Sequence, residues 1–314
     1  MTVFTARVAS PTSGPRHVLA EGPVWNAASG TAASGTVIWV DVVRGTVFEG
    51  ELAGDNVTIL REWQFDGMVG AAVPGPDGSL LVAGQDRVVV VAADGSRTDG
   101  PRIVEEGDPS RTNDGACDPA GRFLIGTLAF DELGGHDKLF QIEDDGSRRT
   151  LDTDLAISNG IAWSLDGRTM YNADTIPAII WSRDYDVETG ATGPRREQFR
   201  IADNPDGICV DARGYIWAAV WGTGQVRCFD LEGAVVDVVE VGVPHVSSVC
   251  FVGPDLDRLL ITTASRDLDE AGLARYSDAG RLFLADVGVT GAPTFPWSGS
   301  WGAGSWGPAA ESTD

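Results

Sequence analysis

Residues 206–241 read DGICVDARGYIWAAVWGTGQVRCFDLEGAVVDVVEV, four short, mostly apolar runs separated by Gly, Asp and Glu. The runs begin at Asp206, Tyr215, Val226 and Val235, and each has the length of a β-strand. The breaks between them contain the small and polar residues that favour tight turns. The stretch therefore predicts four strands joined by turns.

The same plan recurs in six segments of the chain. Their first strands begin 48, 45, 45, 47 and 41 positions apart, and no segment shows sustained helical periodicity. A period near 45 residues with about four strands per unit is typical of a β-propeller. The sequence therefore predicts an all-β protein, a six-bladed β-propeller whose first strands begin at the ring positions Glu21, Val69, Asp114, Asn159, Asp206 and Ser247.

The two ends of the chain bear on how the ring closes. After Arg281–Ala285 the sequence becomes rich in Gly, Pro and Trp, so the sixth blade has no outer strand of its own. We expect an N-terminal strand near Thr2–Ala9 to supply it and to protect an otherwise exposed edge. We assign residues 1–294 to a single propeller domain and residues 295–314 to a tail that wraps loosely or is disordered.

The composition limits the classes of partner. The 314 residues include 46 Asp and Glu against 23 Lys and Arg, a formal net charge of −23. Such a surface repels phosphate backbones, which argues against nucleic-acid binding. The apolar runs are too short to cross a membrane as helices. The N-terminus lacks the apolar core of a signal peptide, so we expect a cytoplasmic protein with four reduced cysteines.

Four of the six ring positions carry a carboxylate or an amide. The first strands of a propeller line its central channel, so these oxygens would converge at one end of it. Such a group is costly to bury without a cation, and oxygen-only donors suit hard divalent ions. Asp-Gly is also a common turn dipeptide, so the spacing alone leaves a metal site and ordinary turns both open.

Four short motifs surround these positions: Ala20-Glu21-Gly22-Pro23-Val24-Trp25, Arg111-Thr112-Asn113-Asp114-Gly115, Ser158-Asn159-Gly160 and Pro205-Asp206-Gly207-Ile208. They resemble the motifs of the regucalcin (senescence marker protein)/gluconolactonase family, in family order over roughly residues 15–290. The resemblance implies a propeller with one catalytic divalent ion (Ca, Zn, Mn, Mg or Fe(II)) held by Glu21, Asn159 and Asp206. It also implies that Arg111 and Asn113 contact a sugar.

We therefore predict a metal-dependent hydrolase that opens an aldonic-acid (sugar) lactone. A cation would polarise the carbonyl, activate water and compensate the oxyanion. Asp206 is the predicted acid/base, because a carboxylate at the ion can accept a proton from nearby water. The planar guanidinium of Arg111 suits a carbonyl or paired hydroxyls, and an ion pair with a surface carboxylate is its alternative role.

Two other functions stay open at this point. A phosphotriesterase-like hydrolase, acting on organophosphates, would share the fold, although Arg111 and Asn113 suit a sugar better than an apolar ester. A calcium-binding regulatory protein would need a closed site, and three protein ligands are too few for the ~6–8 oxygens of such a site. The sequence does not fix the sugar (pentono- or hexono-), the metal, the oligomeric state or the role of His245.

Overall fold

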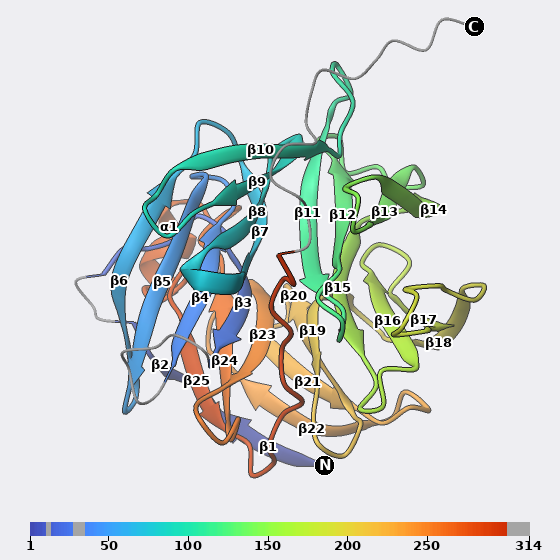
Figure 1. The fold of residues 1–314 in the computed structure, drawn as a ribbon. Helices are drawn as coiled ribbons and strands as arrows, with labels where there is room; N and C mark the ends of the chain where they lie inside the picture. Colours follow the sequence, from blue (N-terminus) through green and yellow to red (C-terminus); the bar gives the residue numbers. More distant parts are fainter. Residues whose placement is uncertain (11–13, 28–34, 300–314) are drawn as a thin grey trace, which may run out of the picture.

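The computed structural model describes residues 1–10, 14–27 and 35–299. In these residues six β-sheets surround a central channel, and the first strand of each sheet lies beside the first strands of its two neighbours (Figure 1). The predicted all-β, six-bladed propeller is confirmed. Blades one to three comprise β3 (Ala20–Asn26), β4 (Thr36–Asp41), β5 (Thr46–Ala53) and β6 (Asn56–Gln64); β7 (Val69–Pro74), β8 (Leu80–Gly84), β9 (Arg87–Val91) and β10 (Arg97–Arg102); and β11 (Ser110–Cys117), β12 (Phe123–Ala129), β13 (Asp137–Ile142) and β14 (Arg148–Leu155).

The second half of the chain builds the other three blades in the same way. Within each sheet consecutive strands pair antiparallel, as short turns require. Blades four to six comprise β15 (Ser158–Trp163), β16 (Thr169–Asp174), β17 (Ile179–Asp184) and β18 (Arg196–Arg200); β19 (Asn204–Val210), β20 (Ile216–Trp221), β21 (Gln225–Phe229) and β22 (Val235–Glu240); and β23 (Val246–Val252), β24 (Arg258–Thr263) and β25 (Phe283–Asp286).

The N-terminal segment closes the ring, but it serves two blades. Strand β2 (Arg7–Val8) pairs antiparallel with β25 and becomes the outer strand of the sixth blade, as predicted. Strand β1 (Thr2–Thr5) pairs parallel with β22 and extends the fifth blade instead. The segment then reaches the first blade, because Ala9 accepts a hydrogen bond from the Val57 amide at 2.8 Å. The N-terminal segment therefore closes the ring by bonding to the fifth, sixth and first blades.

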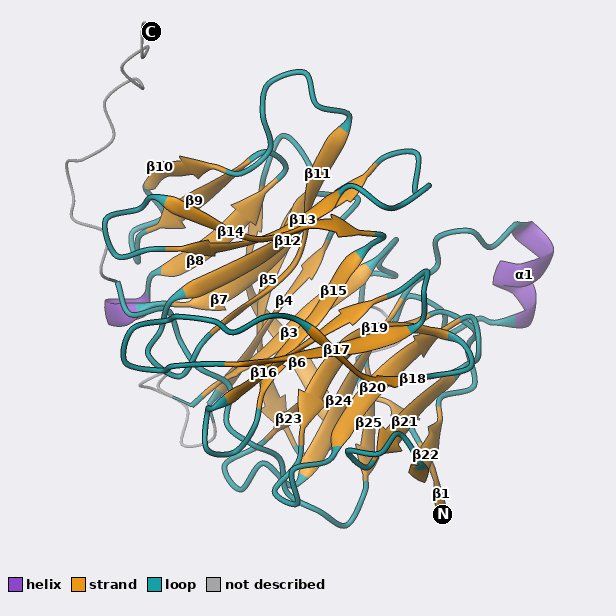
Figure 2. Ribbon diagram, turned by 90° about the vertical axis from the view of Figure 1, so that its right-hand side faces the viewer, coloured by secondary structure: helices purple, strands orange, loops and turns teal. Residues whose placement is uncertain are grey.

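The two faces of the propeller carry different segments. The short helix α1 (Glu270–Arg275) protrudes from one face (Figure 2), and residues 292–298 hydrogen-bond to Val210, Pro74 and Gly121 at the opposite one. The Asp269 side chain caps α1 by accepting a hydrogen bond from the Gly272 amide at 2.7 Å. Among the described residues, no helix has the length and apolar character needed to span a bilayer.

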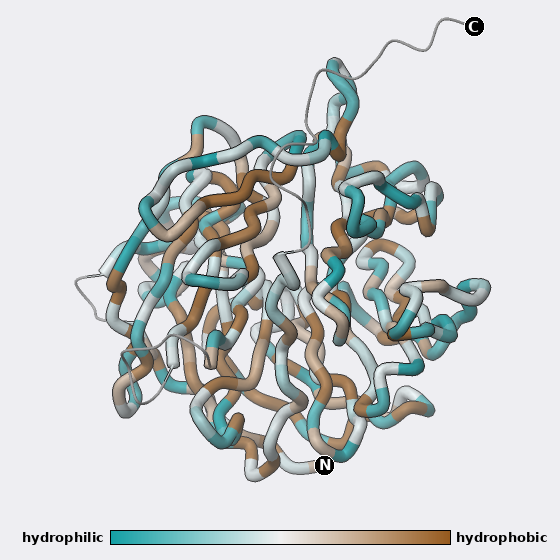
Figure 3. The backbone as a smooth tube through the Cα atoms, viewed as in Figure 1, coloured by the Kyte–Doolittle hydropathy of each residue, from teal (hydrophilic) through white to brown (hydrophobic). Residues whose placement is uncertain are grey.

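The hydrophobic core lies between and within the blades, with hydrophilic residues along the outer turns (Figure 3). Trp217 of the fifth blade meets Phe251 of the sixth edge to face, with ring centroids 6.2 Å apart. Trp25 and Trp163 occupy equivalent repeat positions, and both are buried between neighbouring blades. Each sheet thus buries one face against each of its two neighbours.

The start of the C-terminal tail packs more tightly than expected. The Trp297 side chain is buried between the second and third blades, and its backbone N–H donates to the Pro74 carbonyl at 2.8 Å. The Ser298 N–H donates to Gly121 at 3.0 Å. Loose wrapping from residue 295 is therefore wrong for residues 295–299, since a buried indole removes a large apolar area from water. Trp301 and Trp306 lie outside the described residues.

Candidate active site

Each of the six first strands changes its pairing register at the ring position. A β-bulge of this kind bends the strand and redirects a side chain. Because it recurs in every blade, the ring positions are equivalent in structure as well as in sequence. The register changes lie between Glu21 and Val24, Val69 and Ala71, Thr112 and Gly115, Asn159 and Ile161, Pro205 and Ile208, and Val246 and Ser248.

Glycines that follow the ring positions allow neighbouring first strands to approach closely. A Cβ atom on Gly160 would lie 2.6 Å from the Asp206 carbonyl oxygen. A Cβ atom on Gly207 would lie 2.0 Å from the Ser248 hydroxyl. Both distances are too short for any side chain, so these glycines are required by packing. The Asp206-Gly207 dipeptide therefore belongs to a channel-lining strand and is no hairpin turn.

The structure brings the three predicted metal ligands to one end of the channel. Glu21, Asn159 and Asp206 are 9%, 8% and 6% exposed. Burial raises the pKa of the Glu21 carboxyl, and the nearby charges of Asp206 and Asp114 raise it further. Burial likewise raises the pKa of Asp206, with an added contribution from Asp114 that Arg111 partly offsets. The carboxylates of three blades are therefore close enough to repel one another.

This donor set fits a hard cation. Among the described residues, no donor hydrogen-bonds the Asp206 carboxylate, although the group is buried. Burial also raises the pKa of Asp114 to about 6. Mutually repelling buried carboxylates require a compensating positive charge. In the described part of the chain, no three His, Cys, Asp or Glu side chains form a metal-binding cluster by themselves.

A chain of hydrogen bonds fixes the amides of the site. Arg111 Nη1 donates to Asn113 Oδ1 at 2.8 Å, and Asn113 Nδ2 donates to Asn159 Oδ1 at 2.7 Å. Asn159 Nδ2 donates in turn to the Thr175 hydroxyl at 2.8 Å. The Asn159 oxygen thus keeps one lone pair for a ligand. Both N–H bonds of Asn113 are used, since it also donates to Ser158, so it positions Asn159 as well as facing any substrate.

Arg111 is buried beside these groups, with only 4% of its surface exposed. It forms no ion pair with any residue that the structure describes, so the alternative role in a surface salt bridge is wrong. Burial and the charge of Arg266 lower the pKa of Arg111 to about 10, which leaves it protonated at neutral pH. The guanidinium is therefore a buried cation adjoining the acidic cluster.

His245 and Trp221 form a stacked pair at the same end of the propeller. Their ring centroids lie 4.5 Å apart at an interplanar angle of 3°. His245 Nδ1 donates to the Arg266 carbonyl at 2.9 Å, and burial lowers the pKa of its imidazole. A neutral, stacked imidazole suits a structural role, so His245 supports the segment that carries Arg266.

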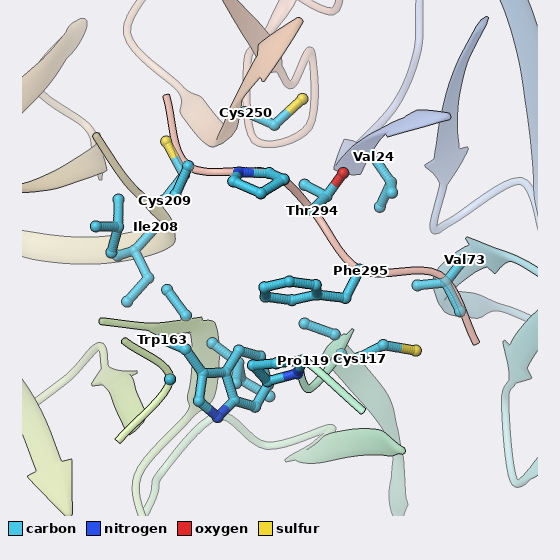
Figure 4. Close-up of a pocket in the computed structure, with 18 of the residues that line it drawn as sticks. Val24, Val73, Cys117, Pro119, Trp163, Ile208, Cys209, Cys250, Thr294 and Phe295 are labelled. Atoms are coloured by element: carbon cyan, nitrogen blue, oxygen red, sulfur yellow. The ribbon is translucent and has the colours of Figure 1, made fainter. Parts of the chain in front are cut away.

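A cavity lies in the channel between the ring position Asp114 and the C-terminal segment (Figure 4). It has a volume of about 440 Å³ and is mostly apolar, with Trp163, Cys209 and Cys250 among its lining residues. The C-terminal segment crosses it, and Phe295 extends into it. Burial raises the pKa of the Cys209 and Cys250 thiols, so they stay protonated and act as small apolar groups.

The sequence alone did not single out Asp137 as a candidate. Its side chain is buried, its Oδ1 accepts a hydrogen bond from the Thr127 hydroxyl at 3.2 Å, and its Oδ2 has no partner among the described residues. Burial raises the pKa of Asp137 to about 6. The position begins a third strand and matches no ring position, so the repeat pattern carries no signal for it.

We expect Asp137→Asn to stabilise the protein at pH 7.5 by about 1–2 kcal/mol. The folded-state pKa of about 6 lies above the unfolded value of ~3.9, so wild-type stability falls as the pH rises through this window. At pH 4 the two proteins should differ little. Urea unfolding at both pH values measures the effect, with the exposed Asp255→Asn as a control. A variant that is less stable than wild type at pH 7.5 would contradict the raised pKa of Asp137.

The chain is similar to known proteins over most of its length. A family model described as "SMP-30/Gluconolactonase/LRE-like region" matches residues 19–265. The chain is 34% identical over 286 residues to pentonolactonase XacC of Haloferax volcanii, covering 88% of this chain and 94% of that protein. It is 31% identical over 289 residues to regucalcin of Xenopus laevis, with coverage of 88% and 94%.

A solved structure has the same fold. A calcium-binding protein named regucalcin from Agrobacterium tumefaciens superposes with a TM-score of 0.84 at 28% identity, covering 95% of this chain and 99% of that chain. The family match includes all of the candidate site residues from Glu21 to Asp206. The chain therefore belongs to the SMP-30/gluconolactonase/LRE-like family.

Proposed function

We propose that this protein is a divalent-metal-dependent lactonase that hydrolyses a sugar lactone. One observation carries the proposal: Glu21, Asn159 and Asp206 meet at one end of the channel, where buried carboxylates repel one another. Relatives named pentonolactonase and regucalcin support the substrate class and the metal.

Glu21, Asn159 and Asp206 would hold the ion as an oxygen-only ligand set. Ca, Zn, Mn, Mg and Fe(II) all suit such donors. When bound, a divalent ion supplies a Lewis acid that polarises the lactone carbonyl and lowers the pKa of a nearby water. With two carboxylates and one neutral amide as ligands, the site keeps room for substrate and water.

The chain's own residues orient the substrate and move the proton. Arg111 uses Nη1 for its hydrogen bonds to described residues, so its other N–H groups can donate to carbonyl or hydroxyl oxygens of a lactone. Asp206 accepts the proton of the attacking water, since its carboxylate has no donor among the described residues. Asn113 fixes the Asn159 amide and offers the second lone pair of its Oδ1 to a hydroxyl.

The decisive experiment assays chelated and metal-reconstituted protein against pentono- and hexonolactones, with an organophosphate as control. We expect no turnover after chelation and recovery on adding one divalent ion per chain. The same ion should raise the melting temperature of the chelated protein, and Glu21→Gln should abolish that rise. Turnover of the organophosphate alone would favour the phosphotriesterase function, and metal binding without any turnover would favour a calcium-binding regulator.

Arg111→Ala should lower kcat/KM for sugar lactones by roughly 5- to 150-fold. This corresponds to a loss of about 1–3 kcal/mol in transition-state stabilisation. The loss reflects a charged hydrogen bond to substrate, so metal affinity should change much less than kcat/KM. Steady-state kinetics on a sugar lactone and on a simple lactone without hydroxyls measure the effect, and the simple lactone should suffer less from Asn113→Ala. Equal losses on both substrates, or none on either, would remove the sugar-recognition role of the pair.

A further inference from the structure

Two loops from opposite blades meet at the end of the channel that holds the candidate site. Residues 130–136 follow β12 in the third blade, and the other loop follows β24 in the sixth. These blades lie three positions apart in a ring of six and therefore face each other. The end of β12 pairs with the start of β11, which carries Arg111, so the first loop rises beside the site.

An ion pair joins the two loops. Arg266 Nη2 lies 2.7 Å from Glu132 Oε1, although the residues are 134 positions apart. Both charges act on the pKa of Arg111, which Arg266 lowers and Glu132 raises, so the pair lies close to this buried residue. Its side chains are 34% and 42% exposed, whereas Arg111 is 4% exposed. The ion pair is therefore close to Arg111 and more exposed to solvent than Arg111 is.

Arg266 and Glu132 differ in how the surrounding structure holds their backbones. The Arg266 N–H donates to the Val18 carbonyl at 2.9 Å, and the Arg266 carbonyl accepts from His245, which is stacked on Trp221. Glu132, by contrast, has a left-handed backbone (φ 53°) that side-chain-bearing residues adopt rarely. Leu133 next to it is 78% exposed. The Arg266 backbone is thus tied to two other segments of the chain, whereas the Glu132 N–H donates to the Ala129 carbonyl, three residues earlier, at 3.0 Å.

We propose that the Glu132–Arg266 ion pair is a gate that determines which lactones enter the site. The inference rests on the proposed lactonase function and adds to it a limit on substrate size. Closed, the pair bridges the mouth above Arg111 and admits a small lactone; a lactone with a bulky substituent requires the pair to separate. An exposed ion pair shifts such an equilibrium by about five-fold at most, so the gate can open at each turnover.

The experiment compares kcat/KM for a pentonolactone with that for an aldonolactone that carries a second sugar. We expect Glu132→Ala and Arg266→Ala each to raise the relative kcat/KM for the bulky lactone by about five-fold. The charge-swapped double variant E132R/R266E should restore the wild-type ratio. Arg196→Ala is the matched control, because the Arg196–Asp184 pair has a similar length of 2.8 Å and is exposed on the outer strands of the fourth blade.

Amide hydrogen exchange tests the gate without substrate. Residues 130–136 should exchange several-fold faster in both single variants than in wild type, and at the wild-type rate in E132R/R266E and in Arg196→Ala. Unchanged exchange and an unchanged substrate ratio in the single variants would overturn the gate, as would a swap that restores neither. A wild-type protein inactive on all lactones would instead reject the proposed function, while the exchange rates would still decide whether the ion pair holds the loop.

Discussion

Asp206→Asn is expected to lower kcat/KM for sugar lactones on the order of 10³-fold, the largest loss that we predict for a single substitution. The amide removes a negative charge from the metal ligands and cannot accept the proton of water. It also places an NH₂ group in a cluster that is otherwise built to attract a cation. Metal affinity, measured by titration of chelated protein, should fall together with turnover.

The same substitution should leave the metal-free protein at least as stable as wild type. Burial and neighbouring carboxylates raise the pKa of Asp206, so its charge is unfavourable in the folded state at neutral pH. Neutralising it relieves that cost. Urea unfolding of chelated protein separates this outcome from misfolding, which would lower both stability and activity.

Asp114→Asn is the matched control for this prediction. Asp114 is a further buried carboxylate of the same cluster, but it is not among the predicted ligands. Its loss of kcat/KM should be at least ten-fold smaller than that of Asp206→Asn. If Glu21→Gln and Asp206→Asn both kept full metal affinity and turnover, the catalytic site would lie elsewhere in the molecule.

The fold could be predicted because its repeat is local. Each blade carries its own strands and turns within about 45 residues, so a single unit such as residues 206–241 displays the whole pattern. The division of the N-terminal segment between β1 and β2 could not be predicted in this way. Thr2–Thr5 and Arg7–Val8 pair with strands more than 230 positions away, and their own sequence does not specify which of two neighbouring edges they join.

The residues of the candidate site could be predicted where they occupy repeat positions, and could not be predicted where they lie in loops. Glu21, Asn159 and Asp206 occupy one repeat position, so the closure of the repeats into a ring is enough to predict that they lie together. Glu132 and Arg266 lie in the connections between the second and third strands of their blades, residues 130–136 and 264–282, which are longer than the same connections in the other four blades. Only the closed ring brings these loops together, and the repeat therefore carries no signal for their contact.

The buried C-terminal segment leads to the second large effect, on stability. Trp297→Ala is expected to lower the free energy of unfolding by about 3–5 kcal/mol. The indole packs with Val73 and Phe123 in the core between the second and third blades. It also lies so close to Gly75 that a Cβ atom there would be 2.9 Å from Trp297 Cε3. Such close packing from two elements leaves little freedom to fill the cavity that alanine would create.

Urea unfolding of the metal-loaded protein measures this loss, with Leu60→Ala as the control, since Leu60 is 53% exposed and its truncation should cost little. The segment from Ala292 to Trp297 bonds to the fifth, first and second blades, so it closes the channel end opposite the helix-bearing face. Because the candidate site lies at the other end, kcat/KM per folded molecule should stay at the wild-type value. A stability loss no larger than that of Leu60→Ala would show that the core is complete without this segment, and a fall in kcat/KM at full folding would show that the two ends of the channel are coupled.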